Sequence, residues 1–163
     1  MIAVRPARPG EEFVIEDVIR RSILASYAHF LPKKVFRRIM DADRPGVEAR
    51  ENGPDFAIAE LDGTPAGAML LTGDYVDHLW THPDFMGRGV GSALLAHAEA
   101  RAAQAGHPRL TLNCFERNKQ ALAFYHARGY ATERTYTASE DIVAGERVCF
   151  MAKQIDPDPA ASR

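Results

Sequence analysis

The stretch that decides the fold reads Phe85-Met86-Gly87-Arg88-Gly89-Val90-Gly91-Ser92. It follows a predicted strand and opens a predicted helix over residues 90–105. Three glycines within five residues let a ligand approach the backbone without interference from a Cβ atom. The first amides of a helix lack internal partners, so together with the helix dipole and Arg88 they predict an anion site. A phosphate or pyrophosphate is the natural occupant, although a tight turn without a ligand is an alternative that this stretch leaves open.

Two familiar phosphate motifs do not describe this turn. A P-loop requires G-x-x-x-x-G-K-[ST], and no lysine follows Gly91. A dinucleotide fingerprint requires a third glycine where this chain has Ser92, and Thr111 stands about where its acidic residue would lie. The turn therefore predicts a phosphorylated ligand of another kind.

A second motif lies downstream of the glycine-rich turn. A strand over 110–115 precedes Asn118-Lys119-Gln120-Ala121-Leu122-Ala123-Phe124-Tyr125-His126-Ala127-Arg128-Gly129-Tyr130. Asn118 is a good N-cap, and Gly129 is a typical residue at a helix end. The segment therefore predicts a helix from Asn118 through Arg128, followed by another strand.

The remaining chain alternates between strand-like and helix-like patterns. Strands are predicted over 2–5, 56–61, 66–71, 75–81, 110–115, 130–137 and 147–153, and two further helices open at Glu11 and at Pro32. Proline and glycine at 44–46 and 52–54 predict loops. We therefore predict the α/β (α+β) class, a mixed, mostly antiparallel sheet of about seven strands flanked by four helices, in the order β-αα-βββ-α-β-α-ββ. Residues 1–155 form one domain, and 156–163 form a flexible tail.

The composition narrows the function class. Twenty Lys and Arg against 22 Asp and Glu give a formal net charge of −2, which argues against bulk nucleic-acid binding. Cys114 and Cys149 are expected to be reduced thiols. Residues 1–8 lack the apolar segment of a signal peptide, and no apolar run reaches membrane-spanning length, so a cytoplasmic location is expected.

Taken together, the two motifs resemble those of the GNAT superfamily of acetyltransferases. That family carries Q/R-x-x-G-x-G/A at a helix start, where this chain has Met86 in the first position and Gly89 and Gly91 in the glycine positions. The family's later motif, N-x-x-A-x-x-[FLY]-Y-x-x-x-G-[FY], is matched from Asn118 to Tyr130. The resemblance covers the chain up to Ile155.

The resemblance implies a fold, a cosubstrate and a binding set. Acetyl-CoA is implied as the acyl donor, with its pyrophosphate on the turn and its pantetheine arm along the main chain of Leu79 and Thr81, like an added strand. The implied cofactor-binding residues are Leu79, Trp80, Thr81, Met86, Gly87, Arg88, Gly89, Val90, Gly91, Ser92, Asn113, Asn118 and Tyr125. Arg117 and Lys119 are candidates for contacts with the adenosine phosphates, or else surface charges.

The implied reaction is transfer of an acetyl group to a primary amine by direct attack in a ternary complex. Tyr125 is implied as the general acid for the leaving thiolate, and Phe124 is expected to take the packing role. For the base we predict Asp77 first and His78 second. With regular pairing Asp77 and Tyr75 share a face with Leu79, and a bulge would reorder them. A non-catalytic acyl-CoA sensor of the same fold is the alternative.

The acceptor site is expected between the early helices and the late hairpin, at Tyr27, His29, Phe30 and Tyr136. These residues predict an aromatic, weakly polar pocket for a small-molecule amine, with a peptide as the second choice. No metal is expected, because His78, His82 and His126 lack the spacing of a metal site. No nucleic-acid or membrane partner is expected, and a homodimer is the predicted assembly.

Overall fold

A single mixed sheet organises the protein. The computed structural model describes residues 1–140 and 142–162, in which seven strands pair in the order β1-β2-β3-β4-β5-β7-β6. The strands are β1 (Ile2–Pro6), β2 (Phe56–Leu61), β3 (Thr64–Thr72), β4 (Tyr75–Thr81), β5 (Arg109–Phe115), β6 (Ala131–Thr137) and β7 (Arg147–Gln154). Every neighbouring pair is antiparallel except β4 and β5, which run parallel. The predicted mixed, mostly antiparallel sheet is therefore confirmed.

Among the described residues the helices number one more than predicted. They are α1 (Glu12–Phe30), α2 (Lys33–Asp41), α3 (Arg44–Asn52), α4 (Val90–Gln104) and α5 (Lys119–His126). The loop predicted over 44–46 is wrong, because α3 begins at Arg44, whereas at 52–54 the helix ends at Asn52 and a 3₁₀ turn follows. Pro45 lies in the first turn of α3, where a proline removes no helical hydrogen bond, so it permits the helix that it seemed to forbid.

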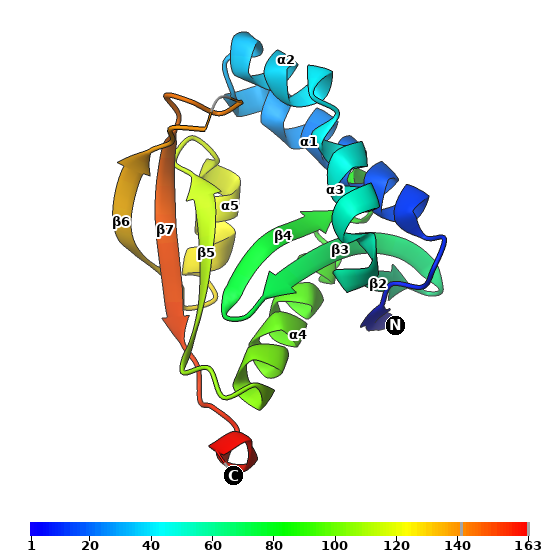
Figure 1. Ribbon diagram of the computed structural model, residues 1–163, viewed down its shortest axis with the longest axis vertical. Helices are drawn as coiled ribbons and strands as arrows, with labels where there is room; N and C mark the ends of the chain where they lie inside the picture. The colour runs from blue at the N-terminus through cyan, green and yellow to red at the C-terminus, as the bar shows by residue number, and fades with distance from the viewer. Residues whose placement is uncertain (141, 163) are drawn as a thin grey trace.

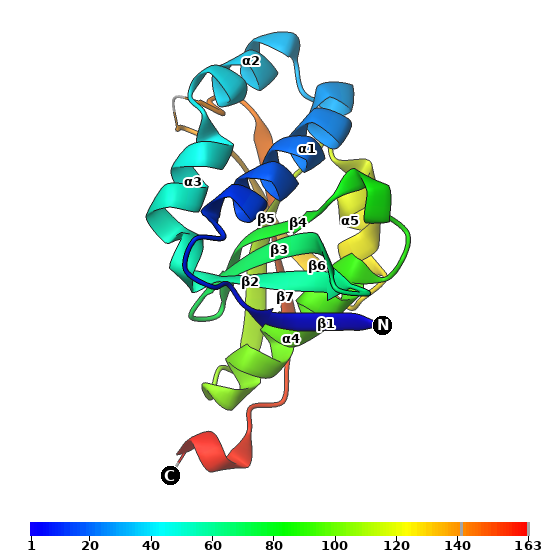
Figure 2. The same ribbon diagram turned by 90° about the vertical axis from the view of Figure 1, so that its right-hand side faces the viewer.

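Helices cover both faces of the first part of the sheet (Figures 1 and 2). Helix α4 packs against β1 to β5 on one face, whereas α1 packs against β3 and β4 on the other and also contacts α3. Two apolar clusters follow from this arrangement. One surrounds Leu94, Leu95 and Met69, and the other surrounds Ile15, Ile19 and Phe56.

Short three-residue or four-residue 3₁₀ turns complete the structure at Gly53–Asp55, Pro83–Phe85 and Pro159–Ser162. Near the C-terminus, the amide of Asp158 donates to the carbonyl of Ala103 at 2.9 Å, which holds this end against α4. No helix in residues 1–140 and 142–162 combines the length and apolar character that a membrane crossing requires.

Candidate active site

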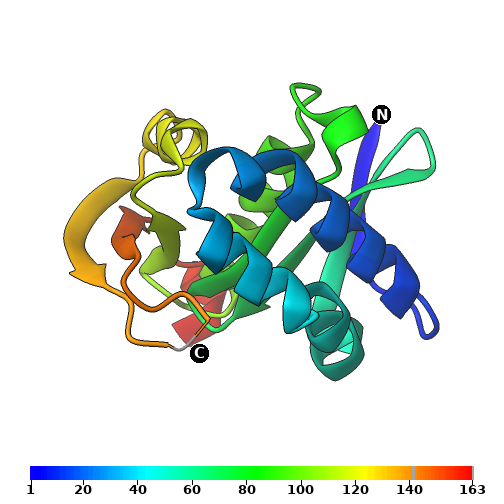
Figure 3. The same ribbon diagram turned by 90° about the horizontal axis from the view of Figure 1, so that it is seen from above.

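The cavity that holds the candidate site arises where β4 and β5 diverge. The two strands pair only at Tyr75 with Thr111 and at Val76 with Leu112, and they separate beyond those positions (Figure 1). A cavity of about 1220 Å³ opens there. Its wall also includes parts of α1, α3, α4 and α5 and of the connection between β6 and β7. Seen from above, α1 and α2 lie on one side of this region and the β6–β7 connection lies on the other (Figure 3).

The edge of β4 that faces the cavity offers main-chain groups. The amide of His82 donates to Ala66 at 2.8 Å, so in this antiparallel pair the main-chain groups of Leu79 and Thr81 point to the other edge. There the carbonyl of Thr81 already accepts a hydrogen bond from Ser22 Oγ at 2.6 Å. Leu79 and Thr81 were predicted to pair with a pantetheine arm. The main-chain N–H and C=O of Leu79 and the N–H of Thr81 therefore remain available for hydrogen bonds to a ligand.

The glycine-rich turn also lines the cavity. Gly87 and Gly89 have φ values of 72° and 88°, which favour glycine, and Gly89 is the N-cap of α4 without any side-chain cap. The amides of the first helical turn therefore lack a protein partner. A Cβ at Gly91 would lie 3.3 Å from Phe124 Cζ and 3.4 Å from Thr81 Oγ1, so glycine at this position lets the start of α4 approach both residues closely.

The cation beside this turn is Arg128, which the sequence did not single out. Its guanidinium donates to Ser92 Oγ, at 3.1 Å from Nε and 2.5 Å from Nη2, and lies 3.7 Å from the ring centroid of Phe124. Arg128 lines the cavity, whereas the exposed Arg88 does not and lies over the ring of Phe85 instead. The available signal was the spacing of four residues between Phe124 on α5 and Arg128 just after the end of that helix.

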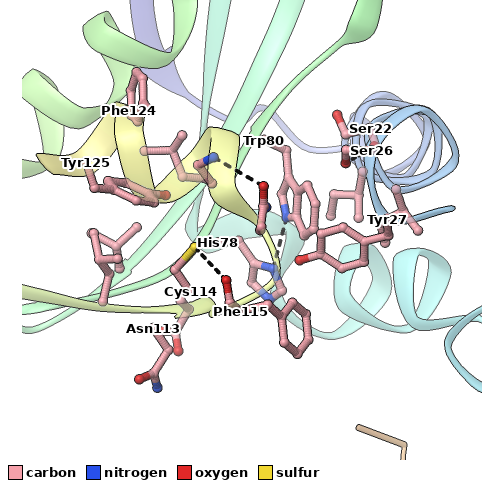
Figure 4. A pocket seen from close by; sticks show the side chains of 18 of the residues that line it. Ser22, Ser26, Tyr27, His78, Trp80, Asn113, Cys114, Phe115, Phe124 and Tyr125 are labelled. Atoms are coloured by element: carbon pink, nitrogen blue, oxygen red, sulfur yellow. Dashed lines mark hydrogen bonds between the residues drawn. The ribbon is translucent and has the colours of Figure 1, made fainter. Parts of the chain in front are cut away.

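Tyr125 projects from α5 toward the centre of the cavity. It is 9% exposed, and burial is the main cause that raises the pKa of its phenol. The phenol therefore stays protonated at neutral pH. The neighbouring Phe124 is less buried than Tyr125, although the sequence assigned the packing role to Phe124. In Figure 4 the hydroxyl groups of Tyr125 and Tyr27 point into the same space from opposite sides.

The two asparagines of the second motif also line the cavity. Asn118 is the N-cap of α5, as predicted, and its Oδ1 accepts from the amide of Ala121 at 3.2 Å. Asn113 lies just beyond the paired residues of β5 and donates to the Tyr75 hydroxyl at 2.9 Å. Arg117 instead faces Glu146 at 3.1 Å, and Lys119 is exposed, so neither lines the cavity.

A β-bulge in β4 rearranges the side chains that were predicted to share a face. Leu70 pairs with His78 and Leu71 pairs with Val76, so Asp77 is an extra residue. Val76, rather than Tyr75, therefore lies in the same cluster as Leu79, beside α4. The face predicted for regular pairing is wrong for this reason. Asp77 is exposed at the cavity rim and accepts a hydrogen bond from Thr72 Oγ1.

His78 lies deeper in the wall and has a partner on each ring nitrogen. Trp80 Nε1 donates to His78 Nδ1 at 3.1 Å, and His78 Nε2 lies 3.2 Å from Glu48 Oε2. An indole only donates and a carboxylate only accepts, so the proton of the neutral imidazole is on Nε2. Burial is the largest influence on the pKa of His78 and lowers it, while Glu48 acts in the opposite direction.

Glu48 comes from α3, the helix that the sequence did not predict. Its side chain is 12% exposed and lines the cavity. Arg44 donates to Oε1, and Asn52 donates to Oε2 at 2.9 Å. Because residues 44–46 and 52–54 were interpreted as loops, no sequence signal directed attention to this carboxylate.

Aromatic rings line the part of the cavity where the acceptor site was predicted. Tyr27 has its ring centroid 5.4 Å from that of Trp80 and 5.5 Å from that of Phe115 (Figure 4). Tyr136 and Tyr27 line the cavity as predicted. Phe30 lies behind them, 5.1 Å from Tyr27, and His29 is exposed, so neither reaches the cavity.

The described residues contain no group of three or more His, Cys, Asp or Glu side chains with the proximity of a metal site. His82 faces Asp17 and Asp84, and the ring of His126 contacts the carbonyl of Tyr130. Both therefore lie apart from His78 and its partners.

Comparison with known proteins places this architecture in a family. The model of the Acetyltransferase (GNAT) family matches residues 18–130. A peptidyl-lysine N-acetyltransferase, YjaB of Salmonella typhimurium, is 44% identical over 138 residues, which cover 80% of this chain and 83% of that protein.

Solved structures agree with that match. A GCN5-related N-acetyltransferase of Rhodopseudomonas palustris superposes with a TM-score of 0.78 at 28% identity, over 94% of this chain and 95% of that one. PaiA N-acetyltransferase of Thermoplasma acidophilum, solved with coenzyme A, has a TM-score of 0.72 at 19% identity, over 94% and 99% of the two chains. At that identity the second structure supports the fold alone.

The relatives contradict one prediction. A small-molecule amine was expected as the acceptor, with a peptide as the second choice. The Salmonella relative is a peptidyl-lysine N-acetyltransferase, which contradicts the prediction of a small-molecule acceptor. The aromatic residues at 27, 30 and 136 suggested a pocket for a small ligand, because residue types alone do not reveal how far a cavity opens to the surface.

Proposed function

We propose, from the premise that this chain belongs to the GNAT family of acetyltransferases, that it transfers the acetyl group of acetyl-CoA to the side-chain amine of a lysine in a peptide or protein. The observation that carries this proposal is one continuous cavity with two different ends. At one end are free helix amides and the Tyr125 phenol, and at the other are aromatic rings and carboxylates.

The cofactor end has the chemistry that a CoA thioester requires. The amides that open α4 and the guanidinium of Arg128 are donors suited to a pyrophosphate. Gly87 and Gly89 carry no Cβ on this turn and have positive φ values, which supports close contact between this backbone and a ligand. The open edge of Leu79 suits an extended amide-containing arm. Acetyl-CoA is a substrate here, and these residues would bind and orient it.

The acceptor end suits a cationic lysine. Glu48, Asp77 and Glu140 line this part of the cavity, while Arg44 is its only Arg or Lys among the described residues. This excess of negative charge attracts an ammonium group. The rings of Tyr27, Trp80 and Phe115 offer apolar surface for the four methylenes of the side chain. The acceptor end is thus more acidic than the aromatic, weakly polar pocket predicted from the sequence.

Two proton transfers must accompany the reaction. A lysine amine with a pKa near ~10.4 is only about 1 part in 10³ neutral at pH 7, so a base lowers a cost on the order of 4–5 kcal/mol. His78 is our candidate for this base, because its imidazole is neutral and lies in the wall, whereas Asp77 is exposed at the rim. The role of Asp77 as the base remains a prediction.

The leaving thiolate needs the second proton. Tyr125 donates it, since burial keeps the phenol protonated. The amine nitrogen loses one of its two remaining protons as the amide bond forms and keeps the other as the amide N–H. The lost proton restores the Tyr125 phenol through water, so the thiol and the amide leave as neutral groups.

The test is acetyl transfer itself. Purified protein, acetyl-CoA and a panel of lysine peptides are followed by mass spectrometry and by thiol release, with lysine-to-arginine peptides as matched controls. We expect acetylation at lysine only. Acetyl-CoA binding without transfer to any peptide would instead support a non-catalytic sensor, and absence of acetyl-CoA binding would reject the proposed cofactor end.

A further inference from the structure

The contacts of the Glu48 carboxylate fix the orientation of the His78 imidazole. Three donors hold the carboxylate, namely Arg44 on Oε1 and Asn52 and His78 on Oε2. Two of them, Arg44 and Asn52, flank Glu48 by four residues on α3, where i, i+4 neighbours meet on one helix face. The carboxylate therefore has a defined orientation toward β4.

We propose that Glu48 is a positioning residue for catalysis, which holds the proton of His78 on Nε2 so that Nδ1 accepts the proton of the incoming lysine ammonium. This inference rests on the proposed function, and it adds a residue that neither family motif contains. The partners of the ring specify the direction of transfer, because only Nδ1 retains a lone pair.

While no lysine substrate is bound, the Trp80 indole donates a hydrogen bond to that lone pair. Its indole N–H is a neutral donor at 3.1 Å. A lysine ammonium forms a charge-assisted hydrogen bond, which is roughly twice as strong as a neutral one, so it displaces the indole. One N–H bond of the ammonium then breaks, one forms at Nδ1, and the positive charge of the imidazolium lies beside the Glu48 carboxylate before the proton leaves to solvent.

The charged and titratable groups around His78 are few. From α3 they are Glu48 and Arg44, and from β4 Asp77, of which the two carboxylates favour the imidazolium and Arg44 opposes it. From α1 the phenol of Tyr27 stays neutral, since burial raises its pKa. From β2 the ring of Phe56 stacks on the imidazole at 5.7 Å and carries no charge.

The test compares Glu48→Gln with Glu51→Gln. Glu51 is a matched control, being an exposed carboxylate on the same helix that does not line the cavity. For Glu48→Gln we expect kcat on a lysine peptide to fall by at least about 10-fold at its plateau. We also expect the acidic limb of the pH profile to move to lower pH, because removal of the negative charge lowers the pKa of His78. Glu51→Gln should change neither quantity.

A nitrogen NMR experiment on the wild-type protein provides a readout that needs no variant. His78 should show its proton on Nε2 at neutral pH. A proton on Nδ1 would overturn the inference, and so would a Glu48→Gln protein that loses rate without moving the acidic limb, since that is a structural effect. If the wild type acetylates no lysine peptide, the proposed function fails and this inference fails with it. If the wild type is active and the limb does not move, only the inference fails.

Discussion

The two ends of the cavity differ in which part of the chain builds them. The cofactor end uses main-chain amides of Gly87 to Ser92 and residues of α5, all within two contiguous motifs. The acceptor end uses side chains from α1, α3, β4 and β5, separated by up to about a hundred positions in sequence. A contiguous motif predicts its own geometry, whereas an assembly of distant side chains depends on the whole fold.

The difference implies that substitutions at the two ends should affect different kinetic constants. Changes at the cofactor end should alter acetyl-CoA binding or the departure of the thiol. Changes at the acceptor end should alter peptide binding while acetyl-CoA binding is kept.

Tyr125→Phe should have the largest effect. The substitution removes only a hydroxyl from a ring that is 9% exposed, so the packing should survive while the general acid is lost. We expect kcat to fall by about 100-fold or more with little change in acetyl-CoA affinity, measured by steady-state kinetics and calorimetry. Unchanged turnover would remove the acid role, and Tyr136→Phe tests whether the loss is particular to α5.

Arg128→Met should weaken acetyl-CoA binding by about 10-fold, because a charge-assisted donor near the pyrophosphate site is lost. The methionine keeps part of the packing on Phe124. Calorimetric titration at two salt concentrations measures the effect, which should shrink as salt rises. Arg101→Met, on the exposed side of α4, is the control. If Arg88→Met weakens acetyl-CoA binding more than Arg128→Met does, then Arg88 makes the phosphate contact, as the glycine-rich motif predicted.

Tyr27→Leu should raise the KM for a lysine peptide by about 3- to 10-fold, since it removes ring contacts with Trp80 and Phe115. The KM for acetyl-CoA should stay constant. Phe13→Leu provides a control on the same helix, because Phe13 is 71% exposed. Equal changes in both constants would show that the two ends are not separable.

Glu11→Gln should have the smallest effect on turnover and act on stability instead. Hydrogen bonds from Arg5 are the main cause that lowers the pKa of Glu11 to about 2. The carboxylate therefore stabilises the folded state above its ordinary pKa of 4.5, and this contribution is lost as pH falls toward 2. We expect a loss of about 1 kcal/mol at pH 7.

Urea unfolding at pH 7 and at pH 3 would measure this, with Glu12→Gln as the control. The difference between wild type and Glu11→Gln should be smaller at pH 3. A difference that is the same at both pH values would show that Glu11 does not act through its charge.

The same contrast explains what the sequence predicted and what it missed. The seven strands along the chain and the N-cap at Asn118 were predicted correctly, since periodicity and capping are local signals. Helix α3 was missed because Pro45 was interpreted without considering that a first turn accepts proline. Because α3 was missed, Glu48 was missed too. The cation at Arg128 was missed because its contact with Ser92 joins residues that lie 36 positions apart in sequence.

The bulge in β4 has a consequence for length variation in this strand. Deleting one residue from a regular strand turns every following side chain to the opposite face. Asp77 is the exception, because Val76 and His78 already point to opposite faces on either side of it. Loss of Asp77 would restore an even alternation and leave His78 and Trp80 on the side of α1. A homologue shorter by one residue at this point would therefore keep the same active-site orientation.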